Sequence, residues 1–341
     1  MKMSKHNTLS FLHPVCRGFG LVELMVALVI SLIMLAGIGQ IFLGSKKSFN
    51  IQDSLGRMQE NGRYAMETMI SDLRRAGYWG GNTDIAEIVG TTGVVIDTTG
   101  ACSSGNTDWI RMLNRRIFGK NNSKGTYACI PSSGTAPYTR GDILVLRYAA
   151  PWEVGGITTP SFENNRYYLR ASLFKGALFT GSQESDASNA VTGSVVRTAE
   201  LVANAYYIGD SSTDCPAGAA VPALYRRTIN NAGAVVSEEI ATGIDHLQVQ
   251  YGIDEEITAS DPRGDDTVNR YLDANAVTNW DQVIAARLWL LIRSECPETG
   301  YTNTNSYEMG DLTGAAAYTP NDGYRRQLYT STVRLRNSSF N

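Results

Sequence analysis

The chain has 341 residues, of which 43% are hydrophobic and 18% charged, and its formal net charge is -3. This length and composition provide a sizeable core and exclude disorder throughout. The small net charge gives no support for nucleic acid as the main partner. His6 and His13 precede the hydrophobic segment, and only His246 follows it. We therefore expect no catalytic site, no metal site and no cofactor.

The first distinctive feature is an uncharged run at residues 24–45, LMVALVISLIMLAGIGQIFLGS. As a helix this run is about 33 Å long, which is enough to cross the hydrocarbon core of a bilayer. The residues before it include Lys2, Lys5 and Arg17 and no acidic residue. A basic flank of this kind stays in the cytoplasm, so we expect the C-terminal bulk in the periplasm.

Glu23 lies at the start of the apolar run. An ionised side chain inside a bilayer costs up to about 3 kcal/mol, and less near an end of the span. A secretory signal would have a shorter apolar core, with Gly37 and Gly39 as its small-residue cleavage site. A plain membrane anchor would avoid the carboxylate. Neither alternative explains Glu23, which needs a compensating partner.

Residues 17–24, RGFGLVEL, resemble the junction between leader and membrane span in type IV prepilins. In that family a dedicated peptidase cuts after the glycine and N-methylates the new terminal residue. The resemblance implies cleavage between Gly18 and Phe19, N-methylation of Phe19, and Glu23 as the fifth residue of the mature chain. Gly20 departs from the family's usual threonine.

The resemblance also implies a role for Glu23 in assembly, because the family's glutamate is thought to pair with the N-terminus of a neighbouring subunit. Cleavage creates an α-ammonium group at Phe19. Two opposite charges about 4 Å apart gain about 4 kcal/mol at an effective dielectric constant near 20. A neighbouring subunit therefore supplies a partner that lipid does not.

No proline occurs between Phe19 and Tyr78, so the helix can continue beyond the membrane. Apolar and small residues then recur at three- and four-residue spacing, which predicts one buried face. This face comprises Leu55, Met58, Gly62, Ala65, Met69, Ile70 and Leu73. We assign the arginines and acids to the other faces: Arg57, Glu60, Arg63, Glu67, Asp72 and Arg74. Gly77 and the glycines at 80 and 81 are expected to close the helix.

Beyond residue 81 the sequence predicts strands separated by polar loops. The best candidates are residues 142–148, 166–174, 201–208, 223–229, 246–253, 283–293 and 327–336. In residues 283–293 every second side chain from Ile284 to Ile292 is apolar, which predicts one buried face; a helix is the alternative. We expect an α+β fold with one long N-terminal transmembrane and amphipathic helix packed on an antiparallel β-sheet, as in type IV pilins.

The expected organisation follows from these elements. Residues 1–18 form the prepilin leader, 19–45 the transmembrane half of the helix, 46–80 its amphipathic half, and 81–341 a β-rich periplasmic domain. No internal repeat or low-complexity tract marks a further domain.

Five cysteines are present, and Cys16 leaves with the leader. The other four are widely spaced and form no CxxC pair, which favours disulfides in an oxidising compartment. They are Cys102, Cys129, Cys215 and Cys296. In a cytosolic location they would be buried thiols. Three pairings exist, of which Cys102–Cys129 and Cys215–Cys296 join sequence neighbours and are the simplest.

An acidic stretch between residues 254 and 266 raises the question of calcium, which takes about six to eight oxygen ligands. Its acids are Asp254, Glu255, Glu256, Asp261, Asp265 and Asp266. The spacing fits no EF-hand, and acidic surface loops are common. We therefore assign no metal to it.

Three later segments narrow the resemblance. Residues 71–80, SDLRRAGYWG, are similar to the helix end of PilW-type minor pilins and of the related minor pseudopilin J of type II secretion. Residues 244–254, IDHLQVQYGID, and 325–337, RRQLYTSTVRLRN, resemble PilW strands. The region between residues 81 and 240 matches no family pattern.

The resemblance implies a minor pilin that helps initiate a type IV pilus and sits at or near its tip. Implied partners are other minor pilins, the major pilin, the prepilin peptidase and an inner-membrane assembly platform, with a tip adhesin as a further candidate. The expected location is the inner membrane and then the pilus at the cell surface. The alternatives are a minor pseudopilin of type II secretion and, in a different class, a membrane-tethered periplasmic binding protein or enzyme.

Overall fold

The computed structural model describes residues 18, 20–82, 84–96, 107–154, 161–193, 195–215, 218, 220–258, 260–261 and 264–337. The chain divides into two compact units, Met1–Asp53 and Ser54–Asn341. The first contains the N-terminal part of the long helix. The second contains the rest of that helix and all of the described strands.

The long helix α1 spans Leu21–Arg75. Its end fits the predicted glycine signal, because Gly77 has a φ of +79° and its amide donates to the Arg147 carbonyl at 2.9 Å. A Cβ at Gly77 would lie 2.6 Å from Cδ of Arg116, so a larger residue would not fit. The Asn337 side chain donates to the carbonyls of Arg75 and Ala76, at 3.3 and 3.2 Å, and caps the helix.

Twelve strands and a second helix follow within the described residues. The strands are β1 (Ile88–Gly90), β2 (Ile117–Lys120), β3 (Tyr138–Ala149), β4 (Tyr167–Ala171), β5 (Gly176–Thr180), β6 (Arg197–Asp214), β7 (Ala220–Ile229), β8 (Val235–Thr242), β9 (Ile244–Ile253), β10 (Arg270–Asp273), β11 (Val283–Arg293) and β12 (Arg326–Arg334). The second helix is α2 (Glu184–Ala190). Short 3-10 helices are η1 (Ile85–Glu87), η2 (Thr107–Ile110), η3 (Gly181–Gln183), η4 (Trp280–Gln282) and η5 (Gly314–Ala316).

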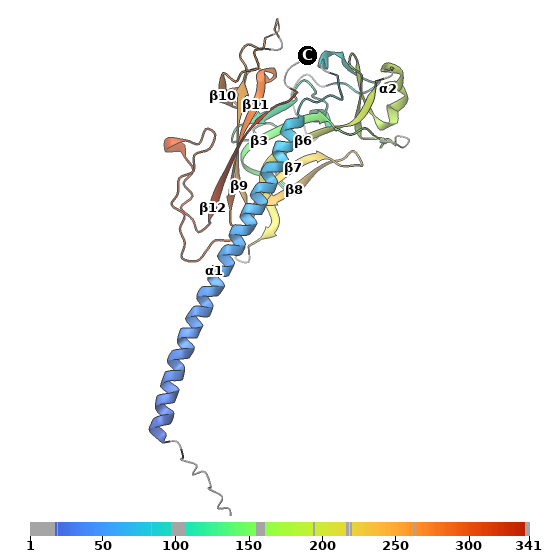
Figure 1. Cartoon of the computed structure of the whole chain (residues 1–341). Coiled ribbons are helices and arrows are strands. Elements are labelled where there is room, and N and C mark those ends of the chain that lie inside the picture. Colours follow the sequence, from blue (N-terminus) through green and yellow to red (C-terminus); the bar gives the residue numbers. More distant parts are fainter. Residues whose placement is uncertain are drawn as a thin grey trace, which may run out of the picture. The chain divides into compact units, whose positions relative to one another are not determined.

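The strands form two sheets (Figure 1). The larger sheet runs β1-β5-β4-β6-β3-β2, and β7 joins it by pairing with both β6 and β8. Its long strand β6 lies between β4 and β3 in this order and also pairs with β7. The smaller sheet runs β10-β9-β11-β12 and is antiparallel throughout. The pairing of β1 with β5 is parallel, so the larger sheet is mixed.

One core is shared by the second half of α1 and both sheets. From the helix it takes Met58, Ala65, Met69 and Leu73. From the larger sheet it takes residues such as Leu144 and Tyr206, and from the smaller sheet Leu247, Leu290 and Val333, among others. The far face of the larger sheet packs on a separate core that includes Trp109 and Leu113. The far face of the smaller sheet, through Leu291, packs on Tyr307 and Met309 from the segment between β11 and β12.

All seven predicted strand segments overlap observed strands, and 283–293 coincides with β11. In β11 the alternate residues from Ile284 to Ile292 are all buried, as predicted, and the helical alternative is wrong. The α+β fold is confirmed, with the parallel β1–β5 pair as the exception to an antiparallel sheet. The sequence did not predict β1, β2, β5, β8, β10 or α2.

Gly62 allows α1 to approach the smaller sheet closely. A Cβ there would lie 2.2 Å from Cδ1 of Ile292 and 2.9 Å from Cε2 of Tyr329. Gly56, six residues earlier in the same helix, is exposed, and a Cβ there would meet nothing within 4 Å. The helix–sheet contact therefore requires a glycine at position 62 but not at position 56.

We expect Gly62→Leu to lower the free energy of unfolding by about 1–3 kcal/mol, because the added side chain overpacks the contact with Ile292 and Tyr329. Gly56→Leu serves as the matched control and should be neutral or stabilising by a few tenths of a kcal/mol up to about 1 kcal/mol, because it replaces an exposed helical glycine. Urea unfolding of the full-length protein in detergent measures both. Equal effects of the two substitutions would contradict the tight helix–sheet contact.

Candidate assembly site

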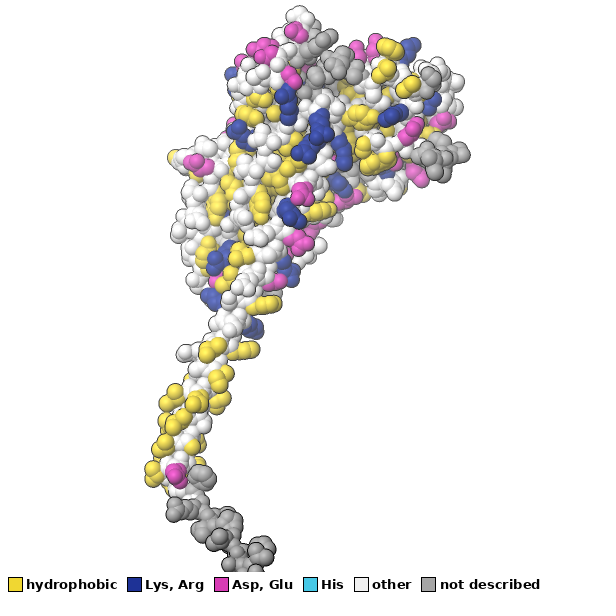
Figure 2. Space-filling model, viewed as in Figure 1, with side chains coloured by type: hydrophobic (Ala, Val, Ile, Leu, Met, Phe, Trp, Pro, Cys, Tyr) yellow, Lys and Arg dark blue, Asp and Glu magenta, His cyan; other side chains and the backbone are white. Residues whose placement is uncertain are grey.

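The N-terminal half of α1 exposes apolar side chains all around. Within the described residues, this is the one helix that is long and apolar enough to cross a membrane, by length and composition, and none of its apolar window is buried. Figure 2 shows hydrophobic side chains along the visible side of this segment. A helix that is apolar on every face suits a lipid environment or a packed bundle of helices.

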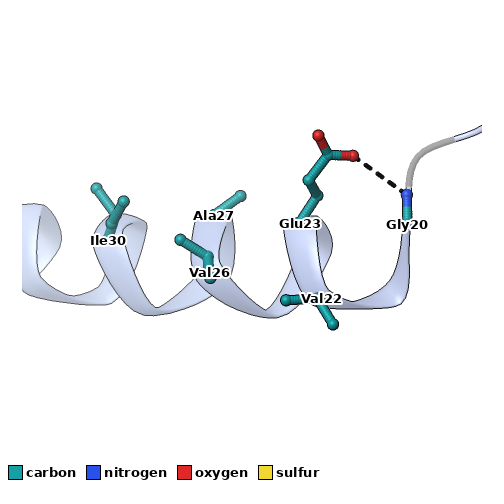
Figure 3. Close-up of a pocket in the computed structure, with 6 residues that line it drawn as sticks. All are labelled: Gly20, Val22, Glu23, Val26, Ala27 and Ile30. Carbon is teal, nitrogen blue, oxygen red and sulfur yellow. Dashed lines mark hydrogen bonds between the residues drawn. The ribbon is translucent and has the colours of Figure 1, made fainter.

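Glu23 is the acidic residue in the first turn of α1. Its Oε2 accepts a hydrogen bond from the Gly20 amide at 3.2 Å, so the carboxylate bends back toward the start of the helix (Figure 3). The surface around it is a shallow recess of about 410 Å³, lined otherwise by Gly20, Val22, Val26, Ala27 and Ile30. A negative charge at a helix N-terminus is favourable. The apolar surroundings nevertheless leave Glu23 with little polar compensation.

The predicted cleavage site lies partly outside the described residues. Gly18 is described and exposed, whereas Phe19 is not described. Cleavage between them and methylation of Phe19 therefore remain predictions.

Asp72 in α1 is buried, and the assignment of Asp72 to a face other than the buried one is wrong. Its Oδ1 accepts from the Tyr148 hydroxyl at 2.7 Å, and its Oδ2 accepts from Asn204 Nδ2 and the Tyr206 hydroxyl, both at 2.6 Å. Arg75 Nη1 lies 3.7 Å from Oδ1. The three- and four-residue spacing could have predicted the burial of Asp72, because position 72 continues the buried series Met58, Gly62, Ala65 and Met69.

The Asp72 contacts join the helix to two neighbouring strands of the larger sheet. Tyr148 comes from β3, and Asn204 and Tyr206 come from β6. Burial raises the pKa of the Tyr206 hydroxyl well above its ordinary value, and the nearby Asp72 charge acts in the same direction. The tyrosines therefore stay protonated and donate. Three donors converging on one carboxylate fix both the rotation and the position of the end of α1.

A second buried carboxylate, Asp245 in β9, joins both sheets. Its Oδ1 accepts from Arg140 Nη1 of β3 at 2.9 Å, and its Oδ2 accepts from Arg326 Nε of β12 at 2.8 Å. The Arg326 side chain is almost fully buried and also donates two hydrogen bonds to Asp322, at 2.5 and 2.8 Å. Asp245 has no exposed surface. A buried carboxylate between two guanidinium groups holds β3, β9 and β12 in one arrangement.

These contacts bring together the three later segments that carry the sequence resemblance. Residues 244–254 and 325–337 meet at the Asp245–Arg326 ion pair. Residues 71–80 and 325–337 meet where Asn337 caps the helix end at Arg75 and Ala76. The motifs therefore form one connected structural unit. Sequence reasoning did not identify Asp245 or Arg326 as partners, because their pairing depends on tertiary structure.

A third buried carboxylate, Asp142 in β3, bonds to backbone amides on both sides of the junction between the sheets. Its Oδ1 accepts from the Asn122 amide and its Oδ2 from the Val249 amide of β9, at 2.8 and 2.7 Å. Burial raises the pKa of Asp142 to about 7, and the charges of Asp311 and Asp273 act in the same direction.

A disulfide joins Cys215 to Cys296, which confirms one of the two predicted pairings between cysteines that follow each other along the chain. The bond ties the segment after β6, in the larger sheet, to the segment after β11, in the smaller sheet. Cys129 is also disulfide-bonded. Cys102 and Cys16 lie outside the described residues.

The acidic loop brings three carboxylates together. Ligand oxygens of Asp254, Glu256 and Asp265 lie within 4.8 Å of one another. Asp254 is buried, and its two oxygens accept from the amides of Glu256 and Asp266 at 3.1 and 2.8 Å. These two hydrogen bonds compensate for the burial of the Asp254 carboxylate and stabilise the loop. We do not assign a metal to this cluster.

Comparison with known families supports the features described above. Residues 14–39 match the prokaryotic N-terminal methylation motif, and residues 205–337 match the family described as Type IV Pilus-assembly protein W, or PilW. The chain resembles type IV pilins and contains a PilW-family domain. The matched domain includes β7 to β12 and part of β6, and it contains Asp245, Arg326 and the Cys215–Cys296 bond. The expectation that residues 81–240 match no family pattern is therefore wrong for residues 205–240.

A PilW-family domain points to a structural subunit of a pilus. The methylation motif overlaps the start of the long apolar helix, which indicates membrane anchoring. Among solved structures, the chain is similar to a type IV-like pilin from Thermus thermophilus, with 12% identity and a TM-score of 0.27 over 60% of this chain and 83% of that one. No curated protein sequence matches the chain.

We expect Asp72→Ala to lower the free energy of unfolding by roughly 2–5 kcal/mol, because it leaves the donors on Tyr148, Asn204 and Tyr206 buried without their acceptor. Glu67→Ala is the control. Glu67 is exposed, and its carboxylate lies 3.6 Å from Arg63 Nε, so its removal should cost less than about 0.5 kcal/mol. Urea unfolding of the full-length protein in detergent gives both values. Similar losses for the two variants would show that Asp72 does not hold the helix.

The raised pKa of Asp142 predicts a pH dependence of stability. Between the ordinary value of 3.8 and about 7, the unfolded chain loses this proton while the folded chain keeps it. The contribution of Asp142 is therefore fully present below pH 3.8 and falls as the pH rises to about 7. Asp142→Asn does not titrate, so its stability relative to the wild type should rise by roughly 2–4 kcal/mol over this window. Unfolding measured across the window tests this, and a constant difference between the proteins would contradict it.

Proposed function

We propose that this protein is a minor pilin that helps initiate assembly of a type IV pilus and sits at or near the pilus tip. The observation that carries the proposal is the isolated carboxylate of Glu23 on an otherwise apolar helical surface, within the N-terminal methylation motif and ahead of a PilW-family domain. A plain membrane tether has no use for that carboxylate.

In this proposal residues 1–18 are the leader, and a prepilin peptidase cuts between Gly18 and Phe19. Phe19 is then N-methylated and carries the terminal ammonium group. Residues 19–45 hold the chain in the inner membrane, and residues 46–80 and 81–341 lie in the periplasm. On assembly, Glu23 pairs with the N-terminal ammonium of a neighbouring subunit. At about 4 Å and an effective dielectric constant near 20, such a pair gains about 4 kcal/mol.

The proposed partners are the major pilin, other minor pilins and the inner-membrane assembly platform, with a tip adhesin as a further candidate. The helix surface supports contact with other helices, because its apolar side chains have no partner within the described part of their own unit. The final location in this proposal is the pilus at the cell surface.

Deletion of the gene tests the proposal against its nearest alternative, a minor pseudopilin of type II secretion. A minor pilin predicts loss of surface pili with protein export intact. Loss of export with pili intact would assign the chain to type II secretion instead. Restoration by the wild-type chain controls for effects on neighbouring genes.

For Glu23 we expect Glu23→Ala to be inserted and cleaved normally, because the Gly18–Phe19 site is unchanged. Its incorporation into sheared pili should fall by at least about tenfold, since losing a few kcal/mol of pairing changes an equilibrium by more than that factor. Glu23→Gln keeps the shape without the charge and should fail in the same way.

The level of each variant in the inner membrane and the mass of its N-terminus control for insertion and cleavage. Incorporation of Glu23→Gln at the wild-type level would show that packing, not charge, is required. Normal incorporation of both variants would remove Glu23 from the mechanism.

A further inference from the structure

Strand β12 forms one border of the smaller sheet. It pairs with β11 over nine residues, and no other strand in the described residues pairs with it. Helix α1 covers its face, where Tyr329 contacts the Gly62 position, and leaves the border itself uncovered by any paired strand. A strand at a sheet border presents a row of backbone donors and acceptors that another chain can pair with.

The register identifies which backbone groups point outward. The backbone amide of Leu335 donates to the carbonyl of Ile284 at 2.8 Å, and the backbone amide of Ser294 donates to the carbonyl of Arg325 at 2.9 Å. Both pairs share the register of the β11–β12 ladder, so the odd-numbered residues of β12 bond to β11. The amides and carbonyls of Leu328, Thr330 and Thr332 therefore point away from the sheet, and no hydrogen bond among the described residues reaches them.

Protein sheets usually protect such a border with proline, with lysine, or by making the strand short. The interior of β12, QLYTSTV, contains no proline and no charge, and its arginines stand only at the two ends. Gln327, Thr330 and Thr332 are exposed. This border is long, uninterrupted and open, which favours strand addition over protection.

A recess of about 400 Å³ lies beside the C-terminal end of this border. Its lining includes Thr332, Arg334 and Arg336 from β12 and the residues after it, Arg74 from α1, and Asp266. Asp266 contacts Arg334. Arg74 and Arg336 are exposed, so the recess has an excess of positive charge. Guanidinium groups bind carboxylates through paired hydrogen bonds.

We propose that an extended segment of a neighbouring filament subunit adds to β12 as a further strand and places an acidic side chain in this recess. The backbone groups of Leu328, Thr330 and Thr332 supply the pairing, and Arg74 and Arg336 select the acidic side chain. This inference rests on the proposed function, because it takes the partner to be another pilus subunit. A protein strand fits better than nucleic acid, because the chain is acidic overall and phosphates cannot complete an alternating ladder of donors and acceptors.

The test uses proline at an outward-facing position. Thr332→Pro removes an amide that β11 does not use, so the internal ladder stays intact while an added strand is blocked. Thr332→Val is the matched control, because it changes the side chain and keeps the amide. We expect Thr332→Pro to reduce incorporation into sheared pili by at least about tenfold, from the loss of hydrogen bonds and the steric block. Thr332→Val should stay within about twofold of wild type.

Membrane level and formation of the Cys215–Cys296 bond report whether each variant folds. A folded Thr332→Pro chain that is incorporated normally would overturn the proposal, as would an equal defect in Thr332→Val. Where the wild-type chain is itself dispensable for pili, the proposed function fails instead, so the two failures are distinguishable.

A second measurement does not depend on the proline variant. A photo-reactive benzophenone side chain at Thr330 of the full-length chain, activated in piliated cells, should crosslink to another pilus subunit at a peptide that contains Asp or Glu. Arg74→Glu with Arg336→Glu should reduce that adduct severalfold, because it reverses the charge of the recess. An adduct with a second copy of this chain, with nucleic acid, or with nothing would overturn the proposal.

Discussion

The burial of the Asp72 carboxylate against Tyr148, Asn204 and Tyr206 is the interaction on which the rest of the domain depends. A buried charge is tolerated only where donors surround it, so the helix has one acceptable rotation and one acceptable depth against the larger sheet. That placement brings Gly62 onto the smaller sheet, where no side chain fits. Both sheets then share a single helix as the centre of their common core.

Two carboxylates in α1 face the same physical problem with different solutions. Asp72 finds its donors within its own domain. Glu23 has the Gly20 amide as its hydrogen-bond donor among the described residues and is otherwise surrounded by Val22, Val26 and other apolar groups. The first carboxylate therefore stabilises the monomer. The second, in the proposed mechanism, makes the isolated subunit in a bilayer less favourable than the assembled one.

The sequence predicted elements whose residues repeat with the period of their own structure. The spacing of Met58, Ala65 and Met69 revealed the buried face of α1, and the alternation in 283–293 revealed β11. Asp72 was misassigned because its charge outweighed its position in the same spacing. Strand β8 was missed because Glu238 and Glu239 interrupt its apolar pattern; in the fold Glu238 pairs with Arg226 and Glu239 accepts from Tyr225. Such compensation comes from neighbouring strands and is invisible in a local pattern.

In the candidate site, too, some residues could be predicted from the local sequence and others could not. Glu23 can be predicted from the sequence alone, because a carboxylate beside an uninterrupted apolar run is unusual and the local sequence is enough to show it. The Asp245–Arg326 pair and the open border of β12 appear only once β9, β11 and β12 are aligned. No spacing within either segment contains that information.

The cap on α1 has a consequence for the order in which the chain folds. The side chain that closes the helix at Arg75 belongs to Asn337, 262 residues later. The partners of Gly62, Ile292 and Tyr329, are also made near the end of synthesis. Contacts between such distant segments form slowly. The apolar stripe of the helix is therefore synthesised first and stays without its partners until almost the whole chain has been made, an interval in which exposed apolar surface favours aggregation.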